Sequence, residues 1–318
     1  MMWYPILAFF VALAALLLLM KTRLSMIALD QPNHRSLHTH VTPRTGGLAI
    51  MSGIVSAAIA GELPLLWLLP LVLLLAFSLV DDIRGLPVPW RLTAQLLGSA
   101  VFVVSALPQG PWWLLGLMVL TITWMINLYN FMDGADGLAG GMAVAGFTSY
   151  AIAAWLASNP QFATMNASIA TASLAFLLFN FHPARIFLGD AGSVPLGFLA
   201  GAFGLYGWQQ GLWPAWFPLL VFSPFIVDAS VTLLKRLLRG EKVWQAHRTH
   251  YYQRLIQLGW GHRKTALAEY VLMLGVGSAA IFLLNQSLVV VIAVLIAWAV
   301  VYALLMRVIN EQWAGRSI

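Results

Sequence analysis

Long apolar runs follow one another along almost the whole chain, and they restrict its fold more than any other feature. A transmembrane helix needs about 20 mostly apolar residues, since its backbone polar groups must be satisfied without water. The sequence predicts an all-α bundle of about eleven transmembrane helices, or ten if one of the shorter runs does not cross. The runs are approximately 3–20, 46–60, 65–80, 92–107, 112–126, 138–157, 167–181, 194–208, 213–234, 265–284 and 287–306.

The composition agrees with a membrane protein. Hydrophobic residues make up 61% of the chain and charged residues only 9%, with a mean hydropathy of +0.84, whereas soluble domains contain about 25% charged residues. The absence of cysteine excludes disulfides and thiolate metal sites. In a membrane protein, the net charge of +6 does not indicate a nucleic-acid partner. We treat residues 1–318 as a single domain, with the first run as an uncleaved helix because it lacks a basic leader.

The positions of the charges predict the topology. With eleven spans, all seventeen Lys and Arg residues fall in or beside alternate loops, and the opposite loops contain none. Basic loops stay in the cytoplasm, so the N-terminus is expected outside and the C-terminus inside. Ten of the eleven acids and all seven histidines lie on the same side. The functional face is therefore expected to be cytoplasmic.

The stretch Asn127-Leu-Tyr-Asn130-Phe-Met-Asp133-Gly-Ala-Asp136-Gly closes one apolar run with polar groups. If the stretch is helical, Asp133 and Asp136 share one face, as do Asn130 and Asp133. Oxygen ligands and nearby glycines suit Mg²⁺ and phosphate. A purely structural turn is the alternative, but polar groups at a membrane boundary are costly.

Two further acidic motifs follow apolar runs. Asp81 and Asp82 are adjacent carboxylates that repel, so a metal ion or cation partner is expected; a helix that simply ends in acids is the alternative. Gly189-Asp190-Ala-Gly-Ser193 is typical of a loop that opens a helix. Such a helix start favours phosphate, with Asp190 beside it as a metal ligand. Alternatively, Asp190 or Ser193 only caps the helix.

Two basic loops complete the polar face. Residues 30–47 include Arg44 and mix cations with Gly and Pro, which also fits an ordinary solvated loop. Residues 235–264 contain His247, Arg248 and His250, a set that suits pyrophosphate better than zinc, because no third His or Cys is near. The start of this segment also fits a basic helix on anionic lipid. Asp228, within an apolar run, needs a polar partner.

Carboxylates, amides and cations thus come from the loops 21–45, 81–91, 127–137, 180–193 and 235–264. A nucleotide sugar would bring a Mg²⁺-bound pyrophosphate to this face, and a lipid phosphate would bring a nucleophile at the same level. This arrangement predicts phosphoryl transfer, in which positioning and charge neutralisation do most of the catalysis.

These motifs, taken together and in this order, resemble those of the polyprenyl-phosphate N-acetylhexosamine-1-phosphate transferases of the glycosyltransferase family 4 type. The resemblance runs from Asp30 to Tyr252. It implies a cytoplasmic cleft in the bacterial inner membrane. It also implies Mg²⁺-dependent transfer of a sugar 1-phosphate from a UDP-sugar to undecaprenyl phosphate, with release of UMP. Mn²⁺ is expected to substitute for Mg²⁺, and a homodimer is the family-level expectation.

The resemblance also implies roles for individual residues. Asp190 would be a Mg²⁺ ligand, with Asn130 or Asp133 near the metal. Asp81 would deprotonate or orient the lipid phosphate, and Asp82 would help to place Mg²⁺. We expect direct attack by the lipid phosphate rather than a phospho-enzyme on an aspartate. The other residues expected to bind substrate are Arg44, Asn127, Asp136, Asn180, Ser193, His247, Arg248 and His250.

One departure from the family pattern bears on the sugar. Relatives that act on peptidoglycan precursors or GlcNAc carry His-x-His-His, whereas this chain has His247-Arg-Thr-His250. That string is more similar to the branch that initiates O-antigen or related glycans, so we expect FucNAc, QuiNAc or GlcNAc, with phospho-MurNAc-pentapeptide as the alternative. A CDP-alcohol phosphotransferase or an aromatic prenyltransferase fits the acidic motifs poorly. A transporter would place ionisable groups near the membrane centre. This chain concentrates them at one face, so a transporter also fits less well.

Overall fold

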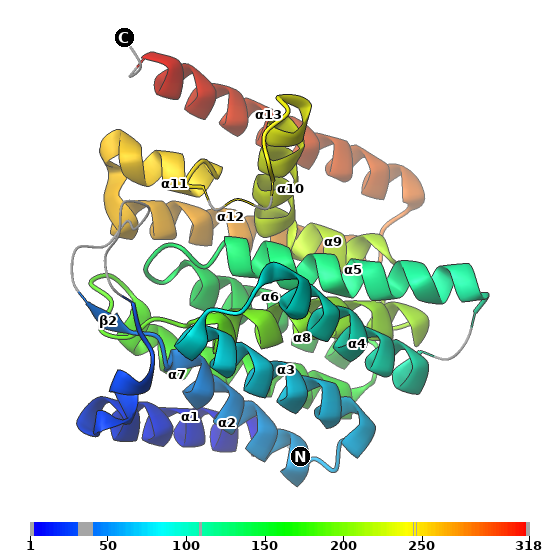
Figure 1. Ribbon diagram of the computed structural model, residues 1–318. Helices are drawn as coiled ribbons and strands as arrows, with labels where there is room; N and C mark the ends of the chain where they lie inside the picture. Colours follow the sequence, from blue (N-terminus) through cyan, green and yellow to red (C-terminus); the bar gives the residue numbers. More distant parts are fainter. Residues whose placement is uncertain (1–2, 31–40, 108–109, 244, 246, 316–318) are drawn as a thin grey trace.

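The computed structural model describes residues 3–30, 41–107, 110–243, 245 and 247–315, and its regular structure is almost all helical (Figure 1). The larger helices are α1 (Tyr4–Lys21), α2 (Gly46–Ala60), α3 (Leu65–Arg84), α4 (Val88–Ala106), α5 (Trp112–Phe131), α6 (Leu138–Leu156), α7 (Pro160–Asn180), α8 (Asp190–Gln209), α10 (Ser223–Leu238), α12 (Gly261–Leu283) and α13 (Leu288–Gly315). Short elements connect them: η1 (Arg23–Ile27), α9 (Trp216–Val221), α11 (Tyr251–Leu255), η2 (Ile256–Trp260) and the paired strands β1 (Leu29–Asp30) and β2 (Thr42–Pro43).

Every apolar run predicted from the sequence contains a helix, and the run 213–234 contains two. The chain breaks at Phe222, the residue between α9 and α10, because Pro224 has no N–H to donate to Leu220. Within the described part of the chain, seven helical segments are long and apolar enough to cross a membrane. The all-α membrane bundle is therefore confirmed, whereas the number of eleven crossings and their orientation stay predictions.

Small residues bring neighbouring helices close together. A Cβ atom at Gly53 of α2 would lie 2.4 Å from the carbonyl oxygen of Ala8 in α1, and one at Gly197 of α8 would lie 2.8 Å from the Cα atom of Ile126 in α5. Only glycine allows backbones to approach this closely. Most helices run side by side, but α10 stands across them (Figure 1).

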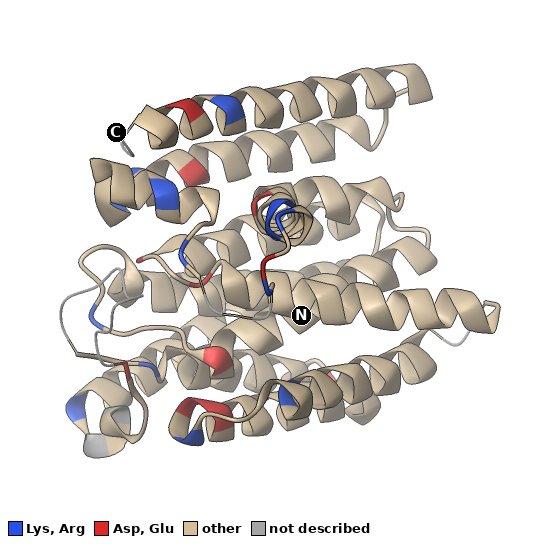
Figure 2. Cartoon of the chain, turned by 45° about the horizontal axis from the view of Figure 1, so that its top comes forward, with Lys and Arg blue, Asp and Glu red and all other residues tan. Residues whose placement is uncertain are grey.

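Charged residues gather toward one end of the helices (Figure 2). We call this the polar end; it carries residues 41–47, 81–91, 130–137 and 180–193. There, Gly46 and Gly47 donate backbone hydrogen bonds to the carbonyl oxygens of Phe187 and Leu188, both at 2.9 Å. These bonds fix the start of α2 against the loop that leads into α8. Residues 31–40 of the predicted first loop lie outside the described residues.

Candidate active site

Asp82, at the end of α3, holds the start of α8. Its carboxylate accepts hydrogen bonds from the backbone N–H groups of Asp190 (3.1 Å) and Ala191 (2.9 Å). These are the first N–H groups of the helix, which otherwise lack partners. The start of α8 was predicted to bind phosphate, and this is wrong for these two groups because Asp82 already occupies them. The predicted catalytic role of Asp82 stays a prediction.

Gly189 makes this close contact between loops possible. Its φ of +72° lies in the left-handed region, and a Cβ atom there would lie 2.4 Å from the carbonyl oxygen of Arg44 and 2.9 Å from Oδ2 of Asp82. The Arg44 guanidinium lies 3.9 Å from Oδ1 of Asp82. A glycine is therefore required where the loop after β2, the end of α3 and the start of α8 meet.

Asp190 faces α5. Its Oδ1 accepts a hydrogen bond at 2.8 Å from Nδ2 of Asn130, which also donates to Oγ of Ser193 at 2.9 Å. Ser193 is fully buried and donates to the carbonyl oxygen of Gly189. The structure thus brings Asn130, Asp190 and Ser193 together, with Ser193 behind the asparagine rather than on the surface of the cavity.

Arg91, at the start of α4, is a site residue that the sequence reading missed. Its Nη1 lies 3.1 Å from Oδ2 of Asp81 and 3.6 Å from Oδ2 of Asp190. Asp81 also accepts a 2.6 Å hydrogen bond from the backbone N–H of Leu86. The sequence signal was the short turn between α3 and α4, which returns a cation toward the acids. Arg91 is thus a cation partner of Asp81, whereas the cation beside Asp82 is Arg44.

Two cavities meet at Asp190. The smaller, of about 20 Å³, is lined by polar groups that include Asp81, Arg91, Asn127 and Asn130, and by apolar side chains of α3 and α8. The larger, of about 130 Å³, is lined by Asp30, Arg44, Asp133, Gly134, Ala135, Asp136, Asn180, Phe187, Gly189, Asp190 and His262. Asp190 lines both cavities, so residues of all three acidic motifs lie around it.

Asp133 and Asp136 would share one face only if their segment were helical. Because α5 ends at Phe131 and α6 begins at Leu138, both instead lie in the turn between these helices. Both still line the larger cavity. Burial, together with the nearby carboxylates of Asp190 and Asp82, raises the pKa of Asp133 well above its ordinary value. A cation in this cavity would remove that repulsion.

The donor atoms fit Mg²⁺. Asp133 and Asp190 both line the larger cavity, and Mg²⁺ prefers carboxylate ligands while it keeps several waters. The described residues contain no group of three or more His, Asp or Glu side chains arranged to hold a metal ion. The protein would thus supply one or two carboxylates, and water and substrate phosphates the remaining ligands.

Two predicted substrate-binding asparagines mainly bond to the protein. Asn180 is buried, and its amide accepts from the backbone N–H of Gly137 and donates to the carbonyl oxygen of Ile186, both at 2.9 Å. Asn127 donates to Oε1 of Gln95 at 2.7 Å. Both nevertheless border a cavity. These amides fix the backbone around the site, and their contact with substrate stays a prediction.

Asp136 belongs to a cluster that the sequence reading did not find. Its Oδ2 lies 2.6 Å from Nδ1 of His182, its Oδ1 lies 3.4 Å from Nδ1 of His262, and the two imidazole rings are stacked with centroids 5.6 Å apart. The three residues come from different parts of the chain, so no local motif joins them. The cluster connects three segments at the rim of the larger cavity.

The loop with His247, Arg248 and His250 lies beside the site but does not line either cavity. His250 stacks on Phe131, the last residue of α5, with ring centroids 6.2 Å apart. Asp228 accepts hydrogen bonds from the backbone N–H groups of Tyr251 (2.8 Å) and Tyr252 (2.9 Å). Asp228 therefore anchors the start of α11, which gives it a structural role.

Comparisons with known proteins find similarity to glycosyl and phosphosugar transferases. A family model described as glycosyl transferase family 4 matches residues 64–207, the interval that contains Asp81, Asn130 and Asp190. A probable undecaprenyl-phosphate N-acetylglucosaminyl 1-phosphate transferase of Bacillus subtilis (strain 168) is 27% identical, over 97% of this chain and 94% of that protein. A decaprenyl-phosphate N-acetylglucosaminephosphotransferase of Mycolicibacterium smegmatis is 29% identical, over 88% of this chain and 82% of the relative. A phospho-N-acetylmuramoyl-pentapeptide-transferase of Halalkalibacterium halodurans is 25% identical, over 76% and 83%.

Proposed function

Because the chain belongs to glycosyl transferase family 4 and is a phosphosugar transferase, we propose that it transfers a sugar 1-phosphate from a UDP-sugar to undecaprenyl phosphate. The observation that carries the proposal is the position of Asp190 between two cavities of different character. One cavity has a single cation beside apolar helix surfaces, and the other is lined mostly by polar groups.

The smaller cavity, of about 20 Å³, is too small to enclose a phosphate group. At its opening, however, the lipid phosphate would meet a cation and an apolar wall. Arg91 supplies a positive charge there, and Leu74, Phe77 and Val194 supply an apolar wall that continues toward the membrane. The Asp81 carboxylate, at 3.1 Å from Arg91, would orient the guanidinium and accept the proton of a singly protonated lipid phosphate. Arg91 then becomes a phosphate-binding residue, in addition to those predicted from the sequence.

The larger cavity suits the nucleotide sugar. Arg44 lies there with Asp133 and Asp190, so a pyrophosphate meets a cation on one side and carboxylates on the other. Asp133 and Asp190, with Asn130 beside them, would hold Mg²⁺, or Mn²⁺ in its place. When bound, the metal ion neutralises the pyrophosphate and stabilises the leaving phosphate.

The reaction we propose is a direct displacement. An oxygen of undecaprenyl phosphate attacks the sugar-bearing phosphorus of the UDP-sugar. A new P–O–P bond joins lipid and sugar phosphates, while the bond to the uridine-bearing phosphate breaks and UMP leaves with its electron pair. Asn130 and Asp190 hold the point where the two substrates meet. Positioning two bound reactants in this way is the main catalytic contribution.

For the sugar, we propose an N-acetylated hexosamine of the FucNAc, QuiNAc or GlcNAc type, with initiation of a lipid-linked surface polysaccharide of the O-antigen type. Two of the relatives are named as N-acetylglucosamine phosphate transferases, which favours GlcNAc as the first donor to test. The name of a third keeps phospho-MurNAc-pentapeptide as the second candidate. We also propose that the polar end faces the cytoplasm of a bacterial inner membrane, because the basic residues lie at that end.

The test uses the full chain in detergent with undecaprenyl phosphate and Mg²⁺. Separate reactions receive UDP-GlcNAc, UDP-FucNAc, UDP-QuiNAc or UDP-MurNAc-pentapeptide, and UMP release is measured together with the mass of the lipid product. We expect a lipid diphosphate sugar from one of the first three donors, and loss of turnover with a chelator. Turnover of UDP-MurNAc-pentapeptide alone would refute the sugar assignment, and turnover without a divalent cation would refute the metal assignment.

A further inference from the structure

A third cavity, lined by cations and apolar groups, lies away from the active site, between α10, α11 and α13. Its volume is about 420 Å³, and it is lined by Lys235, Leu238, Arg239, Arg254, Asn310, Trp313 and Ala314. Since one water molecule takes up about 30 Å³ of liquid, the cavity has room for a phosphate group with part of a glycerol. Three of its lining residues are cations and none is an acid.

Within the described residues, the cations of this cavity form no ion pair with an acid. Among the described residues, no carboxylate lies within ion-pair distance of Lys235, Arg239 or Arg254. The nearby acids are used elsewhere: Glu241 pairs with Arg236, and Glu311 pairs with Arg307. Three positive charges around one cavity repel each other, and an anion between them would turn this repulsion into attraction.

Arg254 lines the cavity, and contacts with the protein fix its side chain there. The residue is only 9% exposed, its Nη1 donates to Oδ1 of Asn310 at 2.8 Å, and its Nε donates to the carbonyl oxygen of Thr249 at 2.8 Å. Its guanidinium also lies over the rings of Tyr251 (4.9 Å) and Trp313 (5.8 Å). These contacts hold a cation in place before any ligand arrives, which lowers the entropy lost on binding.

The surroundings of the cavity indicate which phosphate it takes. On α10, Leu234, Leu237 and Leu238 are 55%, 60% and 77% exposed, and Leu238 lines the cavity. On α13, Leu304 and Val308 are also at least half exposed. Apolar surface of this kind next to cations fits a molecule with acyl chains and an anionic headgroup. A free phosphate would leave the apolar surface uncovered.

We propose that this cavity binds the phosphate of an anionic phospholipid, with the acyl chains along the exposed faces of α10 and α13. Bound there, the lipid connects α13 to α10 and α11, and the latter two helices flank the loop with His247 and His250. This site is separate from the two cavities that meet at Asp190, so the proposal does not depend on the catalytic assignment.

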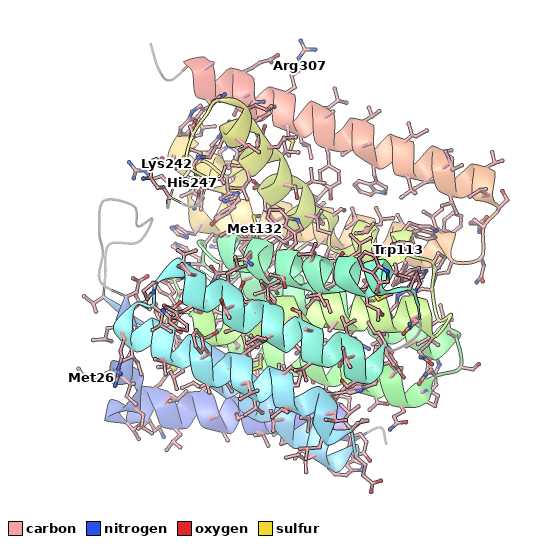
Figure 3. All side chains as sticks on the ribbon, turned by 45° about the vertical axis from the view of Figure 1, so that its right-hand side comes forward. Met26, Trp113, Met132, Lys242, His247 and Arg307 are labelled. Carbon is pink, nitrogen blue, oxygen red and sulfur yellow. The ribbon has the colours of Figure 1, made fainter. Side chains whose placement is uncertain are left out.

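The experiment measures lipid binding to the full chain in detergent by native mass spectrometry. The protein is titrated with phosphatidylglycerol, phosphatidylcholine or inorganic phosphate. The test variant is Lys235→Gln with Arg239→Gln, and the matched control is Arg307→Gln on α13. Figure 3 shows that Arg307 points away from the bundle. Each cation near a membrane surface contributes to anionic-lipid binding by about fivefold, so the double variant should bind phosphatidylglycerol about 25-fold more weakly.

Wild type and Arg307→Gln should bind phosphatidylglycerol equally, and both should prefer it to phosphatidylcholine. Equal loss in Arg307→Gln would refute the site, because it would reflect only total charge. Occupancy by inorganic phosphate at the same concentration as phosphatidylglycerol would refute the lipid assignment. If the double variant does not fold, Arg239→Gln alone serves, since this exposed side chain has no hydrogen bond within the described structure and should weaken binding about fivefold. Unchanged binding in that variant would also refute the proposal.

Discussion

Replacing Asp82 with Asn separates a capping role from a metal-binding role for this carboxylate. Its two oxygens accept hydrogen bonds from the N–H groups of Asp190 (3.1 Å) and Ala191 (2.9 Å), and its side chain is 1% exposed. An amide keeps one acceptor oxygen and turns an N–H group toward the second donor. One hydrogen bond to a charged group is then lost, at a cost of about 1.5–3 kcal/mol.

That cost sets the size of the expected effect. For chains of a few hundred residues, the melting temperature changes by about 2–4 °C per kcal/mol, with the smaller value for larger proteins. With the smaller value, we expect Asp82→Asn to melt about 3–6 °C below the wild type in detergent. Melting is followed by intrinsic tryptophan fluorescence, and the Mg²⁺ dependence of UMP release is measured in the same preparations.

Asp190→Asn is the matched control. The Asp190 side chain is 27% exposed and accepts one hydrogen bond from Asn130, which an asparagine oxygen can still accept. We expect its melting temperature to stay within about 2 °C of the wild type, while turnover falls at least about 100-fold through lost electrostatic stabilisation. The capping interpretation fails if Asp82→Asn melts with the wild type and instead needs more Mg²⁺ for half-maximal activity.

Three further results are expected. Arg91→Gln should raise KM for undecaprenyl phosphate about tenfold, because it removes one charged hydrogen bond to phosphate. Initial rates would test this prediction, and a fall in kcat alone would contradict it. Gly189→Ala should destabilise the protein much more than Gly85→Ala, although both glycines have φ near +70°. A Cβ at Gly189 would meet the backbone of Arg44, whereas one at Gly85 would meet nothing within 4 Å. Equal melting temperatures would refute the close-packed loop. Because the pKa of Asp133 is raised in the folded state, folding favours the protonated acid, and stability without metal should fall as pH rises above about 4. Mg²⁺ should therefore raise the melting temperature more at pH 8 than at pH 5. The reverse order would contradict this account.

The sequence determined the elements of the fold to a large extent. Apolar runs of membrane length leave the backbone little choice but helix, so helices such as α2 (Gly46–Ala60) and α6 (Leu138–Leu156) lie where the runs predicted them. The polar motifs were found as well, because carboxylates and amides at the ends of apolar runs are costly without a purpose. Hydropathy alone could not decide how many helices cross the membrane.

What only the tertiary structure decided is which partner each polar group has. Asp82 meets the start of α8, more than one hundred residues further along the chain, and Asp136 meets His182 and His262 from two other segments. Arg91 becomes a site residue only because α4 returns beside α3. A local pattern records the type of a side chain, but a hydrogen bond requires atoms within about 3 Å. That proximity is fixed by how the helices pack, which no short stretch of sequence contains.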